Sequence, residues 1–253
     1  MQWTHLWHEA IDSTQAEARR LLAEGRPGLP LLIQAGRQLA GRGRGRHRWS
    51  SPPGGVYGTL MLPPPRHAAD LAWYPAMACM AWVEVIEALA PGLLVQIKWP
   101  NDLFVNGRKV GGQLVELVAG RDGRQAVLVG SGLNVSTTGG RPLSRATSLE
   151  AEGLVSLPDR HELAARWVRN FLTFQAIVRA PNSEPKLIAR FEALLWARGC
   201  RVRISTGGAA HPKAVEGVLL GVGPGARARV LALSAGTLEP RLVADGSLRV
   251  LAR

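Results

Sequence analysis

A short glycine–arginine segment is the first part of the sequence that could do chemistry. Residues 40–49 read AGRGRGRHRW, with glycines at 41, 43 and 45 between arginines at 42, 44 and 46. Glycine lets the backbone approach a ligand closely, and arginine forks can bind a carboxylate or a phosphate at two points. Trp49 adds a flat apolar face on which a purine can stack. The segment predicts an anion cradle, and a solvated basic loop is the simpler alternative.

A second segment combines scarce lysines with a carboxylate. Residues 98–116 read KWPNDLFVNGRKVGGQLVE, and only four of the 31 basic residues in the chain are lysines, at 98, 109, 186 and 213. Where arginine is the default cation, Lys98 and Lys109 are candidates for a role that requires lysine. Lys109 stands just before the pair Gly111–Gly112, which lets a ligand lie close to the backbone. A solvated lysine at a strand start is the alternative.

The same segment offers one candidate metal ligand. Pro100 keeps Trp99 extended, so Lys98 and Asp102 should flank a tight turn. Phosphate-bound magnesium often takes only one or two protein carboxylates, and Asp102 could supply one. A turn-forming aspartate explains the same residue without a metal.

Two weaker segments contain glycines or hydroxyl groups. GSGLNV at 130–135 places two glycines and Asn134 where they could border a ligand or form a bulge. DSTQ at 12–15 brings hydroxyls that could bind a polar ligand, although helix capping also explains Ser13 and Thr14.

The elements that must position these residues follow from start, stop and turn signals. Ser13 or Thr14 should cap a helix that ends at Gly25, with Glu17 completing a capping box. Pro75 should open a buried helix over 75–90. Asn106–Gly107 and Asp122–Gly123 predict tight turns between strands. The remaining strands are expected at 31–34, 56–62, 93–99, 103–105, 109–118 and 125–135, and further helices at 159–179 and 185–198, the first opened by Asp159.

Beyond Gly199 the pattern changes to short apolar runs separated by glycine-rich turns, which is typical of a small β-barrel. The sequence therefore predicts an α+β fold: a mixed β-sheet with flanking helices over residues 1–198, followed by a small all-β domain over residues 199–253.

Composition limits the class of protein. The 253 residues are 46% hydrophobic, which is enough for a substantial core, and the net charge is +12. Such a charge raises the expectation of a nucleic acid or a membrane surface as partner, but here the arginines are spread along the whole chain. Cys79 and Cys200 have no metal-ligand spacing and suit a reducing, cytoplasmic setting. The start lacks signal-peptide character, and the apolar stretch Leu71–Val83 is too short to span a bilayer.

Four segments in this order resemble the catalytic domain of biotin–protein ligases: STQ, then QLAGRGRGRHRW, then KWPNDLFVNGRKVGGQLVE, then GSGLN. The resemblance covers roughly residues 10–200, and the C-terminal strands fit the SH3-like barrel of that family. It implies an enzyme that forms an amide bond in two ATP-dependent steps. Biotin is activated to biotinyl-5′-AMP, and the biotinyl group then passes to one lysine of a biotin carrier protein.

The resemblance also implies roles for residues. Lys109, Arg44 and Lys98 are expected to be catalytic, with Lys109 preferred over Lys98 as the central lysine. Asp102 is expected to hold Mg²⁺. The biotin-binding set is Ser13, Thr14, Gln15, Gln38, Gly41, Arg42, Gly43, Arg44, Lys109, Gly112, Leu114, Gly130 and Ser131. The ATP-binding set is Arg44, His47, Trp49, Lys98, Asn101, Lys109 and Asn134.

The sequence departs from the family pattern at three points. A glycine of the loop comes one place early, so that His47 stands where a third loop arginine is usual. Gln15 replaces the usual asparagine. There is no room before residue 10 for a DNA-binding helix-turn-helix, so we do not expect a transcriptional repressor. We also expect no DNA partner and no membrane partner. The resemblance permits a homodimer.

Three alternatives remain at this point. A lipoate- or octanoate-handling ligase could share the same fold. A degenerate relative could bind biotin without turnover because of its altered loop. A basic nucleic-acid-binding protein would explain residues 42–48 and the net charge, and would show steeply salt-dependent affinity.

Overall fold

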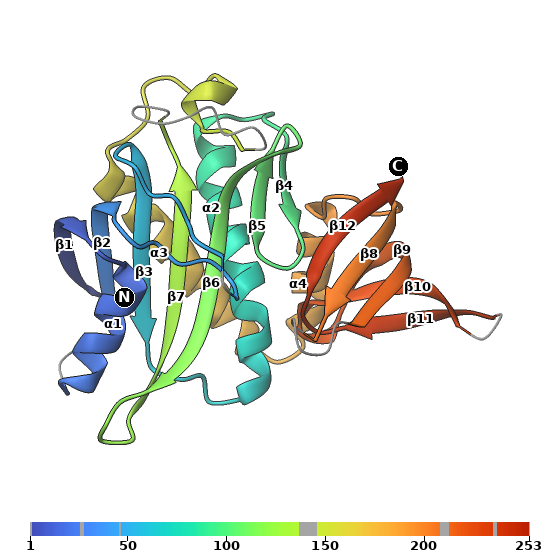
Figure 1. Cartoon of the computed structure of the whole chain (residues 1–253), viewed down its shortest axis with the longest axis horizontal. Helices are drawn as coiled ribbons and strands as arrows, with labels where there is room; N and C mark the ends of the chain where they lie inside the picture. Colours follow the sequence, from blue (N-terminus) through green and yellow to red (C-terminus); the bar gives the residue numbers. More distant parts are fainter. Residues whose placement is uncertain are drawn as a thin grey trace.

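Two β-sheets make up the architecture of the computed structural model, which describes residues 2–25, 28–45, 47–136, 146–207, 213–234 and 237–252. Figure 1 shows a large sheet flanked by helices and a smaller sheet beside it. The large sheet has seven strands in the order β1-β2-β3-β7-β6-β5-β4, and the small one has five in the order β11-β10-β9-β8-β12. The arginine at position 46 of the glycine–arginine segment lies outside the described residues.

The large sheet is mixed, as the sequence predicts. Only β1 and β2 run parallel, and every other neighbouring pair is antiparallel. Its strands are β1 (Thr4–Ile11), β2 (Leu31–Gln38), β3 (Gly55–Leu62), β4 (Val95–Lys98), β5 (Asp102–Val105), β6 (Arg108–Ala119) and β7 (Gln125–Asn134). The helices are α1 (Thr14–Ala23), α2 (Tyr74–Leu89), α3 (Arg160–Val178) and α4 (Glu184–Ala193), with 3₁₀ turns at Ala68–Trp73, Glu150–Glu152 and Pro224–Ala226.

The helices cover the two faces of the large sheet unequally. Because side chains alternate along a strand, Leu32 and Leu60 face one side and join the core formed with α2 and α3. Ile33 and Met61 face the other side and pack against α1 in a smaller core. Since α1 sits over β2, β3 and β7 at one side of the sheet (Figure 1), the rest of that face is left for loops.

Local signals in the sequence are confirmed at the turns and at one helix start. Asn106 and Gly107 both have positive φ, 49° and 75°, in the turn between β5 and β6. Gly123, with φ 79°, lies in the turn between β6 and β7. The carboxylate of Asp159 caps α3 by accepting the backbone N–H groups of His161 and Glu162 at 2.8 and 2.9 Å. The helix predicted from Pro75 is α2, which is buried on nearly every side.

Three expectations are wrong. No capping box forms at α1, because Ser13 makes no side-chain cap and Glu17 binds Arg20 instead at 2.7 Å. The strand expected at 31–34 continues to Gln38, because parallel pairing with the unforeseen strand β1 extends it. The last helix ends at Ala193, since the chain there turns to pair with β4 through Leu194 and Trp196.

The small sheet begins at Arg201, close to the expected start of the all-β segment. Its strands are β8 (Arg201–Thr206), β9 (Lys213–Gly223), β10 (Arg227–Ser234), β11 (Thr237–Val243) and β12 (Ser247–Ala252), all antiparallel. Within the described residues β11 and β12 are its two edges, so the pairing is that of an open sheet and does not close the expected barrel.

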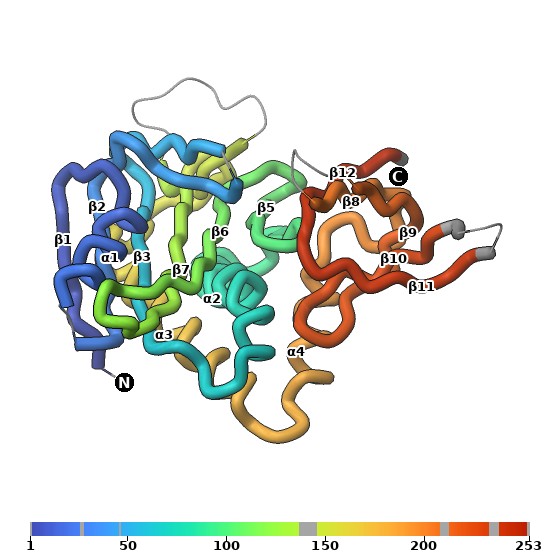
Figure 2. The backbone as a smooth tube through the Cα atoms, turned by 60° about the horizontal axis from the view of Figure 1, so that its bottom comes forward, coloured from blue at the N-terminus to red at the C-terminus, as the bar shows by residue number. Residues whose placement is uncertain are grey.

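The small sheet is attached to the β4–β5 side of the large one (Figure 2). The backbone of Ile97 in β4 donates to Leu194 O at 2.7 Å and accepts from Trp196 N at 2.9 Å. The indole N–H of Trp99 donates to Ala226 O at 2.8 Å, from the turn before β10. None of the helices in the described part of the chain is long and apolar enough to cross a membrane.

The two cysteines should differ in reactivity. Cys79 is completely buried in α2, and this burial raises the pKa of its thiol, so little reactive thiolate forms. Cys200 is partly exposed. We expect a thiol reagent such as Ellman's reagent to label one thiol per native chain and two after denaturation. Native labelling should vanish in Cys200→Ser and persist in Cys79→Ser; rapid labelling of Cys79 in the folded protein would contradict the packing of α2.

Candidate functional site

The open face of the large sheet carries a cleft of about 920 Å³ that reaches the small sheet. It is walled by the glycine–arginine segment, by β6 and β7, by the start of α1, and by turns of the small sheet. Most of the residues singled out in the sequence meet here. They are Ser13, Thr14, Gln15, Gln38, Arg42, Gly43, Arg44, His47, Trp49, Asn101, Asp102, Lys109, Gly112, Leu114, Gly130 and Ser131.

The floor of the cleft depends on glycine. Gly112 of β6 and Gly132 of β7 are register partners, and the indole of Trp49 lies directly on them. A Cβ atom at Gly132 would stand 2.5 Å from the Trp49 ring, and one at Gly112 would stand 3.3 Å from it. Trp49 Nε1 is buried and has no hydrogen-bond partner among the described residues. The floor therefore holds a flat aromatic ring with a free donor.

Lys109 forms the centre of the cleft with a carboxylate beside it. Its Nζ atom lies 2.6 Å from Asp102 Oδ1 on the neighbouring strand and 5.3 Å from the centroid of the Trp49 ring. Both side chains are partly exposed, 31% for Lys109 and 23% for Asp102, so they remain accessible from the cleft. Because β5 pairs with β6, the ion pair is fixed by the sheet rather than by a flexible loop.

Arg44 joins the two sheets. Its guanidinium donates to Asn101 Oδ1 at 3.1 Å and to Gly246 O at 3.0 Å, and it forms an ion pair with Asp245. Asp245 and Gly246 lie in the turn between β11 and β12. The small sheet therefore restrains an arginine whose neighbours along the chain include two glycines.

Backbone hydrogen bonds join the two arms of the loop that carries Arg44. Gly43 N donates to His47 O at 2.9 Å and Trp49 N donates to Gly41 O at 2.9 Å. A Cβ atom at Gly41 would stand only 2.4 Å from Trp49 O, so this glycine is required by the close approach of the two strands of the loop. Gly41 thus supports the cleft from outside its lining.

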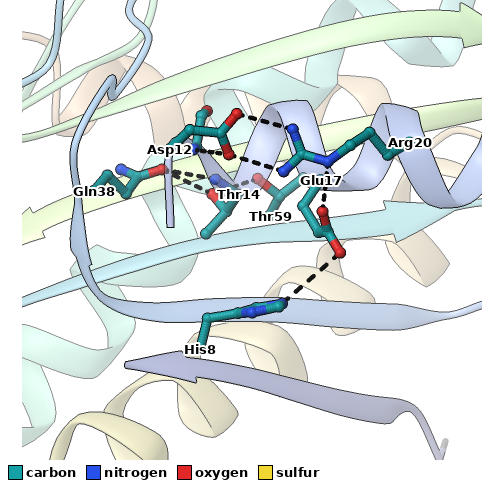
Figure 3. A network of polar contacts seen from close by, with 8 residues as sticks. His8, Asp12, Thr14, Glu17, Arg20, Gln38 and Thr59 are labelled. Carbon is teal, nitrogen blue, oxygen red and sulfur yellow. Dashed lines mark hydrogen bonds and ion pairs between the residues drawn. The ribbon is translucent and has the colours of Figure 1, made fainter. Parts of the chain in front are cut away.

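Neutral polar groups gather at the α1 end of the cleft (Figure 3). Gln38 Oε1 accepts the backbone N–H of Thr14 at 2.9 Å, and Gln38 Nε2 donates to Ser51 Oγ at 2.8 Å. Thr59 Oγ1 lies 2.9 Å from Thr14 Oγ1. Ser13 Oγ is buried and finds no partner in the described structure, which leaves it free for a ligand atom.

A charged network stabilises the segment just before α1. Arg20 donates to both carboxylate oxygens of Asp12 at 2.8 Å and to Glu17 at 2.7 Å (Figure 3). Hydrogen bonds from Arg20 lower the pKa of Asp12 to about 2. Asp12 in turn accepts the backbone N–H of Ser13 at 2.7 Å, so the network fixes the backbone from which Ser13 points into the cleft.

Three residues named from the sequence do not line the cleft: Gly41, Lys98 and Asn134. The Lys98 Nζ atom lies 5.7 Å from the centroid of Phe104 and 5.6 Å from that of Trp196, and burial lowers its pKa. Asn134 donates to Thr147 O at 3.0 Å. Between the two lysines, the geometry therefore favours Lys109 as the one that faces a ligand.

Other cleft residues were not foreseen. Glu116 follows Gly112 and Leu114 at intervals of two in β6, and this alternation was a signal that could have identified it. Thr59 was not singled out because most of its neighbours in β3 are apolar. The residues of the small sheet gave no signal, because a turn far along the chain does not reveal that it reaches residue 44; they are Ser205, Thr206, Gly207, Asp245, Gly246 and Ser247.

Known proteins are similar to this chain in sequence and in fold. Residues 7–134, which include nearly all of the large sheet and the glycine–arginine segment, match the biotin/lipoate A/B protein ligase family. The chain belongs to this family. Over 204 residues, the chain is 30% identical to the biotin–[acetyl-CoA-carboxylase] ligase of Mycobacterium tuberculosis, covering 78% of this chain and 72% of that relative.

Two further family relatives differ in how much of their length is matched. The bifunctional ligase/repressor BirA of Bacillus subtilis is 37% identical over 134 residues, which are 52% of this chain and 40% of that protein, so the chain spans less than half of that relative. The biotin protein ligase of Aquifex aeolicus, solved in complex with biotin and ATP, has a TM-score of 0.80 at 26% identity, covering 98% of this chain and 99% of that one. The small sheet therefore has a counterpart in a solved structure of the family.

The ion pair between Arg44 and Asp245 should hold the glycine–arginine loop in place. Because Asp245 is 77% exposed, the pair contributes no more than about 1 kcal/mol. We expect Asp245→Asn to speed tryptic cleavage after Arg44 by up to about fivefold in the ligand-free protein. Glu239→Gln, an exposed carboxylate of the same sheet, is the matched control. Unchanged cleavage in Asp245→Asn would mean that Asn101 and the backbone alone restrain the loop.

Proposed function

We propose that this protein activates biotin with ATP to give biotinyl-5′-AMP and pyrophosphate, and then transfers the biotinyl group to a lysine of a biotin carrier protein. One observation carries the proposal. A single cleft has buried neutral donors and acceptors at one end and two cations, Lys109 and Arg44, at the other. Biotin has a neutral cyclic urea at one end and a carboxylate at the other, and the carboxylate must meet a phosphate. Family membership supports the same reading.

The neutral end would bind the ring system of biotin. Ser13, Thr14, Gln15 and Gln38 would meet its polar atoms, and Gly130 leaves room because a Cβ atom there would stand 2.6 Å from Gln15 Oε1. Leu114 and Ser131 would line the sides of this pocket. The unpartnered Ser13 Oγ supplies one hydrogen-bonding group that a ligand would satisfy.

The charged end would bind the carboxylate and the nucleotide. Lys109 would bridge the biotin carboxylate and the α-phosphate, and Arg42, Gly43 and Arg44 would form the cradle around them. Trp49 would stack near the adenine, with its free Nε1–H as an additional donor. His47 and Asn101 would lie along the phosphates. Lys98 and Asn134 could act only from behind the cleft wall, where the structure holds them.

Magnesium would be coordinated by very few protein side chains. Within the described residues no group of three or more histidine, cysteine, aspartate or glutamate side chains could hold a metal ion. Asp102 is the carboxylate beside Lys109, and magnesium held mainly by phosphate oxygens needs only one or two protein carboxylates. When bound there, Mg²⁺ would neutralise phosphate charge.

The chemistry of both steps relies on positioning and fixed positive charge. In the first step a carboxylate oxygen of biotin attacks the α-phosphorus, and the bond to the pyrophosphate oxygen breaks. Lys109 and Arg44 would stabilise the charge that gathers on the phosphoryl oxygens. In the second step the neutral amine of the carrier lysine attacks the acyl carbon, AMP leaves, and the amine proton passes to solvent.

The proposal also covers the protein partner, the cellular location, the oligomeric state and the division into domains. The partner would be the carrier domain of a biotin-dependent carboxylase, in the cytoplasm, with a homodimer as the assembly. We assign residues 1–198 to the catalytic domain and residues 199–253 to a second domain that contributes Asp245 and its neighbours to the cleft. Neither DNA nor a membrane is required by this scheme.

The decisive experiment is biotin-dependent release of pyrophosphate from ATP and Mg²⁺ without a carrier protein. We expect a burst of about one equivalent per active site, because the adenylate remains bound and blocks further turnover. Lipoate in place of biotin should give no burst. If lipoate gives a burst and biotin does not, the substrate is lipoate. If biotin binds tightly but gives no burst, the protein is a degenerate ligase in which the altered loop abolishes the chemistry.

Two variants test the assignment of the charged end. We expect Lys109→Ala and Arg44→Ala each to reduce the rate of adenylate formation by about 100-fold or more, because each removes fixed charge from the transferring phosphoryl group. Lys186→Ala is a control for loss of a surface cation. Rapid-quench measurement of the adenylate gives the rate, and thermal melting checks the fold. A near-wild-type rate in either cleft variant would refute the assignment.

A further inference from the structure

Glu116 is a charged side chain at the neutral end of the cleft. Its Oε2 atom accepts from Gln15 Nε2 at 2.8 Å, and its Oε1 atom forms an ion pair with Arg19 at 2.8 Å. Glu116 is 25% exposed, whereas Gln15 is 3% exposed. The carboxylate therefore touches the buried polar cluster from its edge, and none of the steps described above uses it.

The charge of Glu116 fixes the orientation of Gln15. A carboxylate has no proton to donate and can only accept hydrogen bonds, so the amide nitrogen of Gln15 must face Glu116. The carbonyl oxygen of the same amide then points to Thr59 Oγ1, 3.0 Å away. With a neutral neighbour in place of Glu116, the amide could adopt either of two orientations.

The orientation of the Gln15 amide sets the direction of the hydrogen bonds made by two hydroxyl groups, those of Thr59 and Thr14. Since Gln15 Oε1 can only accept, the single proton of Thr59 must be donated to it. The proton of Thr14 then has two acceptors within reach, Thr59 Oγ1 at 2.9 Å and Gln38 Oε1 at 3.2 Å, and the shorter contact is the one to Thr59. Thr14 and Thr59 are almost completely buried, so solvent does not compete for these protons.

The result is a chain of hydrogen bonds with one direction, from Thr14 through Thr59 and Gln15 to Glu116. The hydroxyl proton of Thr14 is used within the chain, so its oxygen offers only lone pairs to the cleft. Gln38 Oε1, which accepts the backbone N–H of Thr14 at 2.9 Å and lies 3.2 Å from Thr14 Oγ1, is an acceptor as well. Both groups line the cleft and both favour a ligand that donates.

We propose that Glu116 is a positioning residue that sets the polarity of this chain, and that it thereby selects a ring carrying N–H donors. A cyclic urea has such donors, whereas a dithiolane ring has none. This inference rests on the proposed function and extends it, because it assigns the discrimination between biotin and lipoate to a charge that touches neither ligand. A pocket built around unpaired polar groups rejects a ligand that cannot pair them.

The test compares ligands that share or lack the urea, using the full-length protein and titration calorimetry. We expect Glu116→Gln to weaken biotin and desthiobiotin binding by the same factor, roughly 10- to 100-fold, since hydrogen bonds in a charged network are worth about 1.5–3 kcal/mol. Lipoate binding should not change. In turnover, the KM for biotin should rise while the KM for ATP and kcat at saturating biotin stay near their wild-type values.

Three further variants separate polarity from packing. Arg19→Gln removes the ion pair but keeps the carboxylate, so biotin affinity should fall by less than about threefold. Thr59→Val breaks the chain in the middle at nearly constant volume and should reproduce the selective loss. Glu9→Gln, an exposed carboxylate of β1, is the matched control for the loss of one charge. If circular dichroism shows that Glu116→Gln does not fold, Thr59→Val is used for the test instead.

The outcomes distinguish the inference from the proposed function. Wild-type biotin affinity in Glu116→Gln, or an equal loss of biotin and ATP binding, would overturn the role of Glu116. An Arg19→Gln variant as weak as Glu116→Gln would show that the ion pair matters rather than the polarity, and would also overturn it. Failure of the wild-type protein itself to bind biotin would instead refute the proposed function.

Discussion

The cleft gathers several cations, among them Lys109 and Arg44, and much of the architecture follows from this constraint. Like charges in a partly buried site repel each other more strongly than in water. Two of these cations are each paired with a carboxylate: Lys109 with Asp102 and Arg44 with Asp245. One carboxylate comes from the neighbouring strand of the same sheet, and the other comes from a turn of the second sheet. A phosphate entering the cleft must share or replace these partners.

This arrangement gives the small sheet a role in shaping the cleft. Without the turn between β11 and β12, Arg44 would keep, among the described residues, Asn101 as its one side-chain partner and would sit on a loop rich in glycine. Glycine gives the loop its close approach to a ligand, but the same freedom makes an ordered position costly in entropy. The second sheet offsets that cost by holding the guanidinium from outside the loop.

The two ends of the cleft rely on different interactions, fixed charges at one end and neutral hydrogen-bonding groups at the other. At the Lys109 end there are fixed charges, and a glycine floor allows the aromatic ring of Trp49 to lie against the sheet. At the α1 end, neutral groups are buried, and in our proposal the carboxylate of Glu116 at their edge gives their hydrogen bonds a direction. The unequal cover of the sheet makes both possible, since α2 and α3 occupy one face and α1 occupies only part of the other.

The sequence by itself determined the chemical identity of the site and its local turns. Scarce lysines, the alternation of glycine and arginine, and the Asn106–Gly107 turn are short-range signals, and the structure brings most of the site residues that the sequence indicated to one cleft. Tertiary structure decided the rest. The pairing of β1 with β2 lengthened a strand, the packing of Lys98 between Phe104 and Trp196 removed it from the cleft, and the contact of Asp245 with Arg44 joined positions about 200 residues apart. Such outcomes depend on which distant surfaces meet, and the spacing of residues along a chain carries no record of that.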